Sequence, residues 1–232
     1  MLSIIIPTKN EARYLPTLLA SIQSQTLQPI EIIVADAHST DGTDEIARKA
    51  GCRVVDGGMP GPGRNRGAAV ATGNLLLFLD ADVELTDPFF LEKAVQEFEQ
   101  RNFDFATCDV HPLSDKLIDK VFHGFYNRYV RILAPFHPHA PGFCILARRA
   151  KHELIHGFDE SITFCEDHDY AVRGSHVGTF GILRSVSVPV SVRRLERDGR
   201  FSVAVKYALA DAYFMMIGPI RDDRFHYTFG HK

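Results

Sequence analysis

The sequence has no tryptophan, only four cysteines and no long apolar run. The cysteines (Cys52, Cys108, Cys144 and Cys165) are widely separated. They form neither the close pairs of a zinc knuckle nor the dense framework of a disulfide-rich secreted domain. No apolar stretch approaches the roughly 20 residues that cross a bilayer, and no basic segment introduces a signal peptide. We therefore expect reduced, mostly buried cysteines and a cytoplasmic protein.

The sequence also lacks a strong excess of charge of either sign. The formal net charge is -3 over 232 residues, which gives no indication of a nucleic-acid-binding surface. Hydrophobic residues make up 45% and charged residues 24%, as in an ordinary globular protein. A chain of this length can bury a substantial core, and we expect one domain in two halves.

Short apolar runs alternate with amphipathic segments, which predicts an α/β fold with a mostly parallel sheet and helices on both faces. Strands are expected at 2–6, 31–35, 53–55, 75–79, 103–108, 143–147 and 187–192. Helices are expected to open at Asn10-Glu11 and at Asp87-Pro88, and over 44–49, 64–71, 117–133, 166–173 and 201–217. The segment 57–63, rich in glycine and proline, is predicted to be irregular.

Two aspartates follow the most apolar of these strands. Asp80 and Asp82 come directly after the run 75–79 and, two residues apart on extended backbone, point to the same side. Their hard oxygen atoms suit Mg²⁺ or Mn²⁺ bound against a substrate phosphate. The alternative is that Asp80 only ends the strand and Asp82 begins a turn.

The usual phosphate-binding loops are missing. The first strand is followed by Pro7-Thr8-Lys9-Asn10-Glu11, without the glycines of a dinucleotide fold, and the sequence contains no P-loop. A bound diphosphate would need another source of positive charge, and a metal ion on the two aspartates is the evident candidate.

Five motifs occur in the order in which family 2 glycosyltransferases carry them. They are IIIPTKNE (4–11), IIVADAHSTDGT (32–43), GRNRG (63–67), FLDAD (78–82) and Glu166-Asp167. The chain resembles this family over about residues 2–200. The resemblance implies the glycosyltransferase A-type fold, with a Rossmann-like nucleotide-binding half (1–110) and an acceptor-binding half (111–232).

The resemblance also implies an activity. It is inverting transfer of a sugar from a nucleoside diphosphate sugar to an acceptor hydroxyl, dependent on Mg²⁺ or Mn²⁺. The acceptor would be a glycan or a lipid-linked molecule, in the synthesis of glycans, glycolipids or cell-surface polysaccharides.

Individual residues receive roles from the same resemblance. Asp82, with Asp80, would hold the metal, and Asp167 would be the general base that deprotonates the acceptor hydroxyl. Gly142, Phe143 and Glu166 would lie on the acceptor side. The residues implied to bind the donor are Pro7, Thr8, Asn10, Glu11, Asp36, Arg64, Asp80, Arg194 and Arg197.

Two departures from the family limit what it implies. Ala37 stands where many members have a second aspartate, so only the contact of Asp36 with the nucleotide base carries over. The segment 194–198 keeps only the second basic residue of the Q-x-x-R-W motif of polymerising members, so processive synthesis is not predicted. Simpler interpretations also exist. Glu166-Asp167 could only favour a helix N-terminus, and Arg193, Arg194, Arg197 and Arg200 could be a solvated charge run.

A competing motif points to another class of protein. His152-Glu153-Leu154-Ile155-His156 matches H-E-x-x-H, which in zinc proteases places two histidines on one helix face. Gly157 follows at once, which leaves little helix to support such a site. A zinc metalloprotease and a non-catalytic nucleotide-sugar-binding module are therefore the alternatives.

The acceptor half is less informative. Segments 117–133 and 201–217 combine apolar faces with basic residues (Lys120, Arg128, Arg131, Arg200 and Lys206). We hypothesise that one of them rests on the inner face of a membrane and presents the acceptor. Packing on the core, or on a second subunit in a homodimer, is the alternative. The loop 135–142 is predicted to cover the sugar site. One of its histidines, or His226 or His231, could complete the metal shell.

Overall fold

The computed structural model describes residues 1–28, 30–225 and 229. Across these residues a seven-stranded sheet has the order β3-β2-β1-β4-β6-β5-β7. β6 is antiparallel to both of its neighbours, and the other pairs are parallel, so the sheet is mostly parallel, as predicted. The strands are β1 (Leu2–Thr8), β2 (Ile30–Asp36), β3 (Arg53–Asp56), β4 (Leu75–Leu79), β5 (Phe105–Pro112), β6 (Cys144–Arg148) and β7 (Phe180–Val190).

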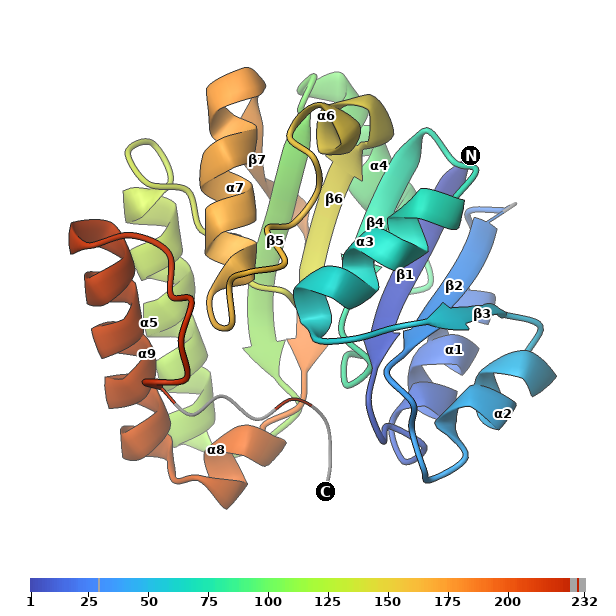
Figure 1. Cartoon of the computed structure of the whole chain (residues 1–232), viewed down its shortest axis with the longest axis horizontal. Coiled ribbons are helices and arrows are strands. Elements are labelled where there is room, and N and C mark those ends of the chain that lie inside the picture. The colour runs from blue at the N-terminus through green and yellow to red at the C-terminus, as the bar shows by residue number, and fades with distance from the viewer. Residues whose placement is uncertain (29, 226–228, 230–232) are drawn as a thin grey trace.

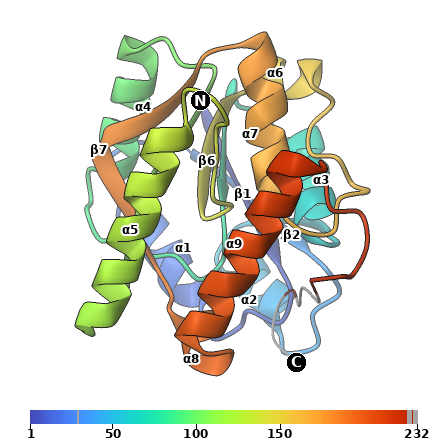
Figure 2. The same cartoon turned by 90° about the vertical axis from the view of Figure 1, so that its left-hand side faces the viewer.

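Helices cover both faces of this sheet (Figure 1). α3 (Pro60–Val70), α6 (Arg149–Leu154) and α7 (Glu166–Val177) lie on one face. The other face is covered by α1 (Leu15–Gln23), α2 (Thr43–Lys49) and α4 (Phe90–Gln100). α5 (Leu117–Leu133) and α9 (Arg200–Met216) lie side by side near the β5–β7 end of the sheet, as Figure 2 shows, and α8 (Arg193–Arg197) follows β7.

Two apolar cores result from the alternation of side chains along the strands. Ile4 and Ile6 belong to the core beneath α1 and α4, whereas Ile5, between them, belongs to the core beneath α3 and α7. All five residues of β4 are buried, which confirms that this strand is covered on both faces. A third, smaller cluster, which includes Phe164 and Phe214, joins α9 to the segment before α7.

The prediction that 57–63 is irregular holds for residues 57–59 but was wrong from Pro60 onward, where α3 begins. Proline suits the first turn of a helix, where its missing N–H would have no partner. The glycines permit close packing, since a Cβ at Gly67 would overlap Ile5 Cγ2 of β1. Contact with the sheet therefore overrides the poor helix propensity of this segment.

Other boundaries also differ from the prediction. α1 begins at Leu15 rather than at Asn10, whose φ of 53° is left-handed. α4 begins at Phe90, three residues after Asp87. β7 begins at Phe180 rather than at 187, and it continues through a register shift beside Cys108 of β5.

The H-E-x-x-H interpretation was wrong. His152 lies in α6, but the helix ends at Leu154 and His156 has a left-handed φ of 59°, so the two histidines do not share a helix face. The His152 ring instead contacts the Tyr170 hydroxyl at 2.9 Å inside an aromatic core. Burial lowers the pKa of His152 to about 4, which keeps it neutral. His152 is therefore a core residue.

The four cysteines are buried and free, as expected. Of the helices described, none is both long enough and apolar enough to span a bilayer.

Candidate functional site

Most of the predicted site residues gather at the edge of the sheet where β1, β2, β4 and β7 end. In open α/β sheets, ligands bind outside the carboxyl ends of the strands. This edge lies in the lower part of Figure 1, near α8. Side chains from α3, α7 and the loop before β6 reach the same region, so the site draws on both halves of the chain.

Asp36 is held rigidly where β1 and β2 end. Its Oδ1 accepts hydrogen bonds from the hydroxyls of Thr8 at 2.8 Å and Ser39 at 2.6 Å, and its Oδ2 accepts one from the Ser39 N–H at 2.8 Å. A carboxylate has about four acceptor positions, so Asp36 retains capacity for a further donor. Asn10 braces the same loops because its Oδ1 accepts from the Thr40 N–H at 2.9 Å. Pro7, also predicted, is buried on β1.

Arg193 joins two buried carboxylates. Its guanidinium donates to both oxygens of Glu11 at 2.8 Å and ion-pairs with Asp82 Oδ2 at 3.0 Å. The guanidinium also lies 4.6 Å from the centre of the Tyr14 ring. Burial raises the pKa of Asp82 to about 6, although Arg193 opposes this shift. The charge of Asp82 is therefore only partly compensated.

The far end of β7 explains how Arg193 reaches this position. Val190 forms an antiparallel bridge with Val83, and the Ser191 N–H donates to the Asp82 carbonyl at 3.1 Å. This pairing carries the chain from the edge of the sheet to the end of β4. Arg193 was predicted only as part of a charge run. The sequence did contain one indication of its position. Arg193 follows the end of β7 by three residues, just as Asp82 follows the end of β4.

Arg64 links the end of β4 to α7. It donates to Glu166 at 2.7 Å and to Asp80 at 2.9 Å, and its side chain is only 2% exposed. Burial opposes its charge, but the carboxylates of Asp80, Glu166 and Asp167 outweigh burial and raise the pKa of Arg64 above its usual range. Arg64 thus remains charged and fixes three carboxylates around one point.

Asp167 is held in place by backbone donors. Its Oδ2 accepts from the Gly142 N–H at 2.7 Å and its Oδ1 from the His168 N–H at 2.9 Å. A Cβ at Gly142 would overlap the Arg64 guanidinium, which would have to move to make room. Phe143, the next residue, is half-buried. Among the residues predicted on the acceptor side, Gly142 therefore donates directly to Asp167, the predicted base. Glu166 precedes Asp167 in the chain and pairs with Arg64.

Arg194 and Arg197 are placed differently from each other. Arg194 donates to the Tyr207 hydroxyl of α9 and is close enough to Asp82 to oppose the rise in its pKa. The Arg197 side chain is 50% exposed and pairs with its neighbour Asp198 at 2.7 Å. The structure therefore brings Arg194 to the site but turns Arg197 toward Asp198.

The carboxylates of this site fit a divalent cation. Five of them (Glu11, Asp80, Asp82, Glu166 and Asp167) surround the guanidiniums of Arg64, which is buried, and Arg193, which is half-buried. Asp80 is the more accessible member of the predicted metal pair, with its side chain 32% exposed against 9% for Asp82. Hard oxygen donors in this excess favour Mg²⁺ or Mn²⁺.

The sequence left open which histidine of the loop, His137 or His139, would complete the metal shell of Asp80 and Asp82. His139 instead lies 2.6 Å from Asp211 of α9. His226 and His231 lie outside the described residues.

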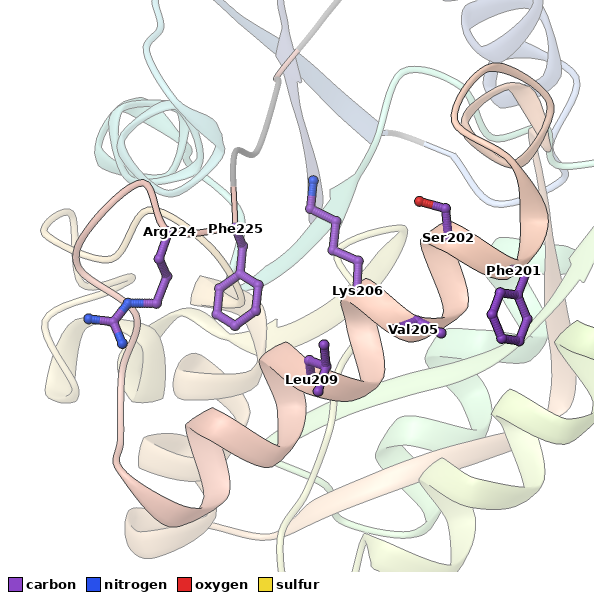
Figure 3. Close-up of a pocket in the computed structure, with 7 residues that line it drawn as sticks. All are labelled: Phe201, Ser202, Val205, Lys206, Leu209, Arg224 and Phe225. Atoms are coloured by element: carbon purple, nitrogen blue, oxygen red, sulfur yellow. The ribbon is translucent and has the colours of Figure 1, made fainter.

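A groove follows the outer side of α9 (Figure 3). Phe201, Val205 and Leu209 line it from the helix, and Arg224 and Phe225 line it from the segment that follows. Phe201 is 77% exposed and Leu209 is 58% exposed, so apolar side chains face solvent here.

Comparison with known proteins identifies similar sequences. The sequence model of Glycosyl transferase family 2 matches residues 3–155. The chain is 31% identical over 144 residues to the 4,4'-diaponeurosporenoate glycosyltransferase of Staphylococcus haemolyticus, which covers 58% of this chain and 36% of that protein. It is 44% identical over 94 residues to a PGL/p-HBAD biosynthesis glycosyltransferase of Mycobacterium bovis, covering 37% and 36%. The chain thus spans little more than a third of these relatives.

Solved structures share the fold. S. aureus TarS (residues 1–349) matches with a TM-score of 0.65 and 20% identity, over 93% of this chain and 72% of that one. The mannosyltransferase PcManGT of Pyrobaculum calidifontis, in complex with GDP-Man and Mn²⁺, matches with a TM-score of 0.69 and 20% identity, over 94% and 70%.

Proposed function

The chain belongs to glycosyl transferase family 2 and has the glycosyltransferase A-type fold; on this premise we propose that it transfers a sugar from a nucleoside diphosphate sugar to an acceptor hydroxyl. The observation that carries the proposal is the meeting of Asp36, Asp80 and Asp167 at one edge of the sheet, bridged in part by Arg64. Relatives named as glycosyltransferases, and similar folds solved with UDP-GlcNAc or with GDP-Man and Mn²⁺, support it.

On the donor side, Asp36 would accept a hydrogen bond from the nucleotide base. Asp80 and Asp82 would hold Mg²⁺ or Mn²⁺, and the ion would supply the positive charge that the departing diphosphate needs. Arg193 and Arg194, both close to Asp82, add positive charge beside the same phosphates.

On the acceptor side, Asp167 is the general base. The Gly142 and His168 N–H groups fix both of its oxygens, so neutral backbone donors keep the carboxylate in one orientation. It takes the proton of the acceptor hydroxyl as that oxygen attacks the anomeric carbon. Attack opposite the departing diphosphate inverts the configuration, as in other single displacements at a sugar.

The acceptor is presented by the joint outer face of α5 and α9. Large apolar side chains of these two helices are strongly exposed, including Leu117 at 76%, Phe125 at 74% and Phe201 at 77%. Large exposed apolar side chains suit an interaction surface, and exposed basic residues of the same helices, such as Arg128, suit anionic headgroups. Two basic residues of the prediction do not contribute, because Arg131 pairs with Asp109 at 3.0 Å and Arg200 with Asp119 at 2.6 Å. We propose contact with a membrane surface that carries a lipid-linked acceptor.

Donor binding tests the core of the proposal. Thermal unfolding of the chain should be followed with a panel of nucleotide sugars, each with Mn²⁺, with Mg²⁺ and with EDTA. A donor at 100 times its Kd should stabilise the protein by about 2.7 kcal/mol, and Asp82→Asn should remove the metal-dependent part. Failure of every nucleotide sugar to stabilise the protein would overturn the proposal. Binding without any release of nucleoside diphosphate would favour a non-catalytic module.

Sedimentation with anionic liposomes tests the membrane surface. Phe125→Glu together with Leu209→Glu should abolish co-sedimentation, whereas Phe89→Glu, a 48% exposed phenylalanine before α4, should not. Absence of binding at low salt contradicts the membrane contact. A dimer that the same double substitution dissociates would assign this face to a second copy of the chain.

A further inference from the structure

Three buried side chains that the donor chemistry leaves unused meet behind the base. His139 comes from the loop before β6, His168 from the first turn of α7, and Asp211 from α9. They are 0%, 8% and 6% exposed, and one ligand atom of each lies within 4.8 Å of the others. We propose that these residues form a second metal site, for a divalent transition-metal ion of the zinc type, separate from the pair of aspartates at the end of β4.

The hydrogen bonds of His139 favour an ion at this position. Its Nδ1 lies 2.7 Å from the His137 carbonyl oxygen, which can only accept, so Nδ1 carries a proton. Its Nε2 lies 2.6 Å from Asp211 Oδ1, the oxygen of a carboxylate that also accepts from the Tyr129 hydroxyl. In neutral His139, two lone pairs would face each other at that distance, so a cation has to lie between them. A proton or a metal ion satisfies this need.

The second histidine distinguishes the metal ion from the proton. His168 Nδ1 is buried and has no hydrogen-bond partner among the residues that the structure describes. It lies 3.7 Å from Asp211 Oδ1, too far for a hydrogen bond. Two ligands of one tetrahedral zinc ion are about 3.4 Å apart, given bonds of about 2.0–2.1 Å. The distance from His168 Nδ1 to Asp211 Oδ1 is therefore close to that between two ligands of one ion, and the His139–Asp211 pair would need to open by about 0.8 Å.

The surroundings match those of known metal ligands. Metal-bound histidines commonly donate their other N–H to a backbone carbonyl, as His139 does, and ligating carboxylates are themselves hydrogen-bonded, as Asp211 is to Tyr129. Two imidazoles and a carboxylate are the three protein ligands of one class of catalytic zinc site. His137, whose ring lies 5.2 Å from that of His139, is a further imidazole close to the cluster.

The ion would fix the acceptor half of the molecule. It would tie α9 to α7, its neighbour in Figure 2, and to the loop before β6, although these segments are separate in sequence. His168 directly follows Asp167, and its Nε2 lies 4.0 Å from Asp167 Oδ1. The metal would therefore hold the carboxylate of Asp167 in place from behind without contacting the reacting atoms.

Metal content tests the inference independently of activity. The full chain, purified without a metal-affinity tag and stripped with EDTA, should be titrated with Zn²⁺, dialysed and measured by inductively coupled plasma mass spectrometry. About one tightly bound Zn²⁺ per chain is expected. His139→Gln and Asp211→Asn should each lose it, and Tyr129→Phe should weaken it by about 10–100-fold. Asp82→Asn and the control His176→Gln, an exposed histidine on α7, should retain it.

Cobalt provides a second measurement on the unaltered protein. Co²⁺ in the cluster should give the visible absorption of a tetrahedral site, which one equivalent of Zn²⁺ should abolish. This outcome does not depend on whether the variants fold. No zinc retained by the wild-type chain and no tetrahedral cobalt spectrum would overturn the proposal, and the cluster would then be a hydrogen-bonded network with a protonated His139. Zinc retained by His139→Gln and Asp211→Asn alike would also overturn it.

Discussion

Replacing Asp167 with asparagine is expected to abolish sugar transfer while donor binding remains nearly unchanged. The substitution keeps the shape of the side chain but removes its ability to take a proton. The asparagine side chain would retain one acceptor oxygen, so either the Gly142 or the His168 N–H loses its partner. Asp36, which is predicted to bind the nucleotide base, is held by Thr8 and Ser39. The substitution leaves these hydrogen bonds as they are.

The magnitude follows from the role of the residue. A positioned general base contributes about 10²–10⁴ to a rate, which corresponds to roughly 3–5 kcal/mol of barrier. The lost backbone hydrogen bond costs about 1 kcal/mol of stability, because Asp167 is 19% exposed and water can replace part of it. The two effects differ enough to be measured separately, one in the turnover rate and the other in unfolding.

The assay is release of nucleoside diphosphate in the presence of donor, Mn²⁺ and acceptor, with donor affinity measured by calorimetry on the same samples. Asp44→Asn is a matched control, since Asp44 also lies in the first turn of a helix but on exposed α2. It should change stability by less than about 1 kcal/mol and leave turnover as it was. Turnover of Asp167→Asn within about threefold of the wild type would refute the assignment of the base, since removal of a general base costs at least about 10².

Three further changes test the site and the core. Arg193→Ala leaves Glu11 and Asp82 without their shared cation. The free energy of unfolding in urea should therefore fall by on the order of 2–4 kcal/mol, and Mn²⁺ should restore part of it. A loss that Mn²⁺ does not reduce would contradict a cation site there. Gly142→Ala should displace the Arg64 guanidinium and lower the free energy of unfolding by about 1–3 kcal/mol. Gly124→Ala, at an open position of α5, should not lower it. An unchanged melting temperature for Gly142→Ala would argue against the close packing. His152 is neutral when folded because burial lowers its pKa to about 4, so its contribution is complete above pH 6.5 and is lost as the pH falls and the unfolded chain takes up the proton. The unfolding free energy should fall by about 2 kcal/mol from pH 7 to pH 5, and a His152→Gln variant with the same slope would contradict this.

Patterns of neighbouring residues in the sequence predicted those features that interactions between neighbouring residues determine. The apolar run of β4 gave a buried strand because its residues cannot remain in water on either face, and Asp80 and Asp82 follow where that burial ends. The start of α3 was missed because its glycines are poor helix formers in isolation and are favourable only against β1. Propensity acts within a few residues, whereas this packing brings together positions about 60 apart in the chain.

The sequence did not reveal that Arg193 pairs with Glu11 and Asp82. The order and pairing of the strands decide which distant side chains come into contact. Arg193 reaches Glu11 across 182 positions because Val190 pairs with Val83, and no periodicity encodes that pairing. The H-E-x-x-H motif, by contrast, rests on the spacing of neighbouring residues alone. Because α6 ends at Leu154, its two histidines do not share a helix face.

Charge balance connects these partners to the function. Arg64 and Arg193 each hold carboxylates from separate segments, yet the five carboxylates around them still outnumber the two guanidiniums. A dianionic diphosphate entering such a site would meet like charge in a region of reduced dielectric, where repulsion between unit charges 4 Å apart is about 4 kcal/mol. A divalent cation removes this penalty and also lowers the cost of the partly compensated Asp82. Metal and donor are therefore each expected to bind better in the presence of the other, because each supplies the charge that the other needs.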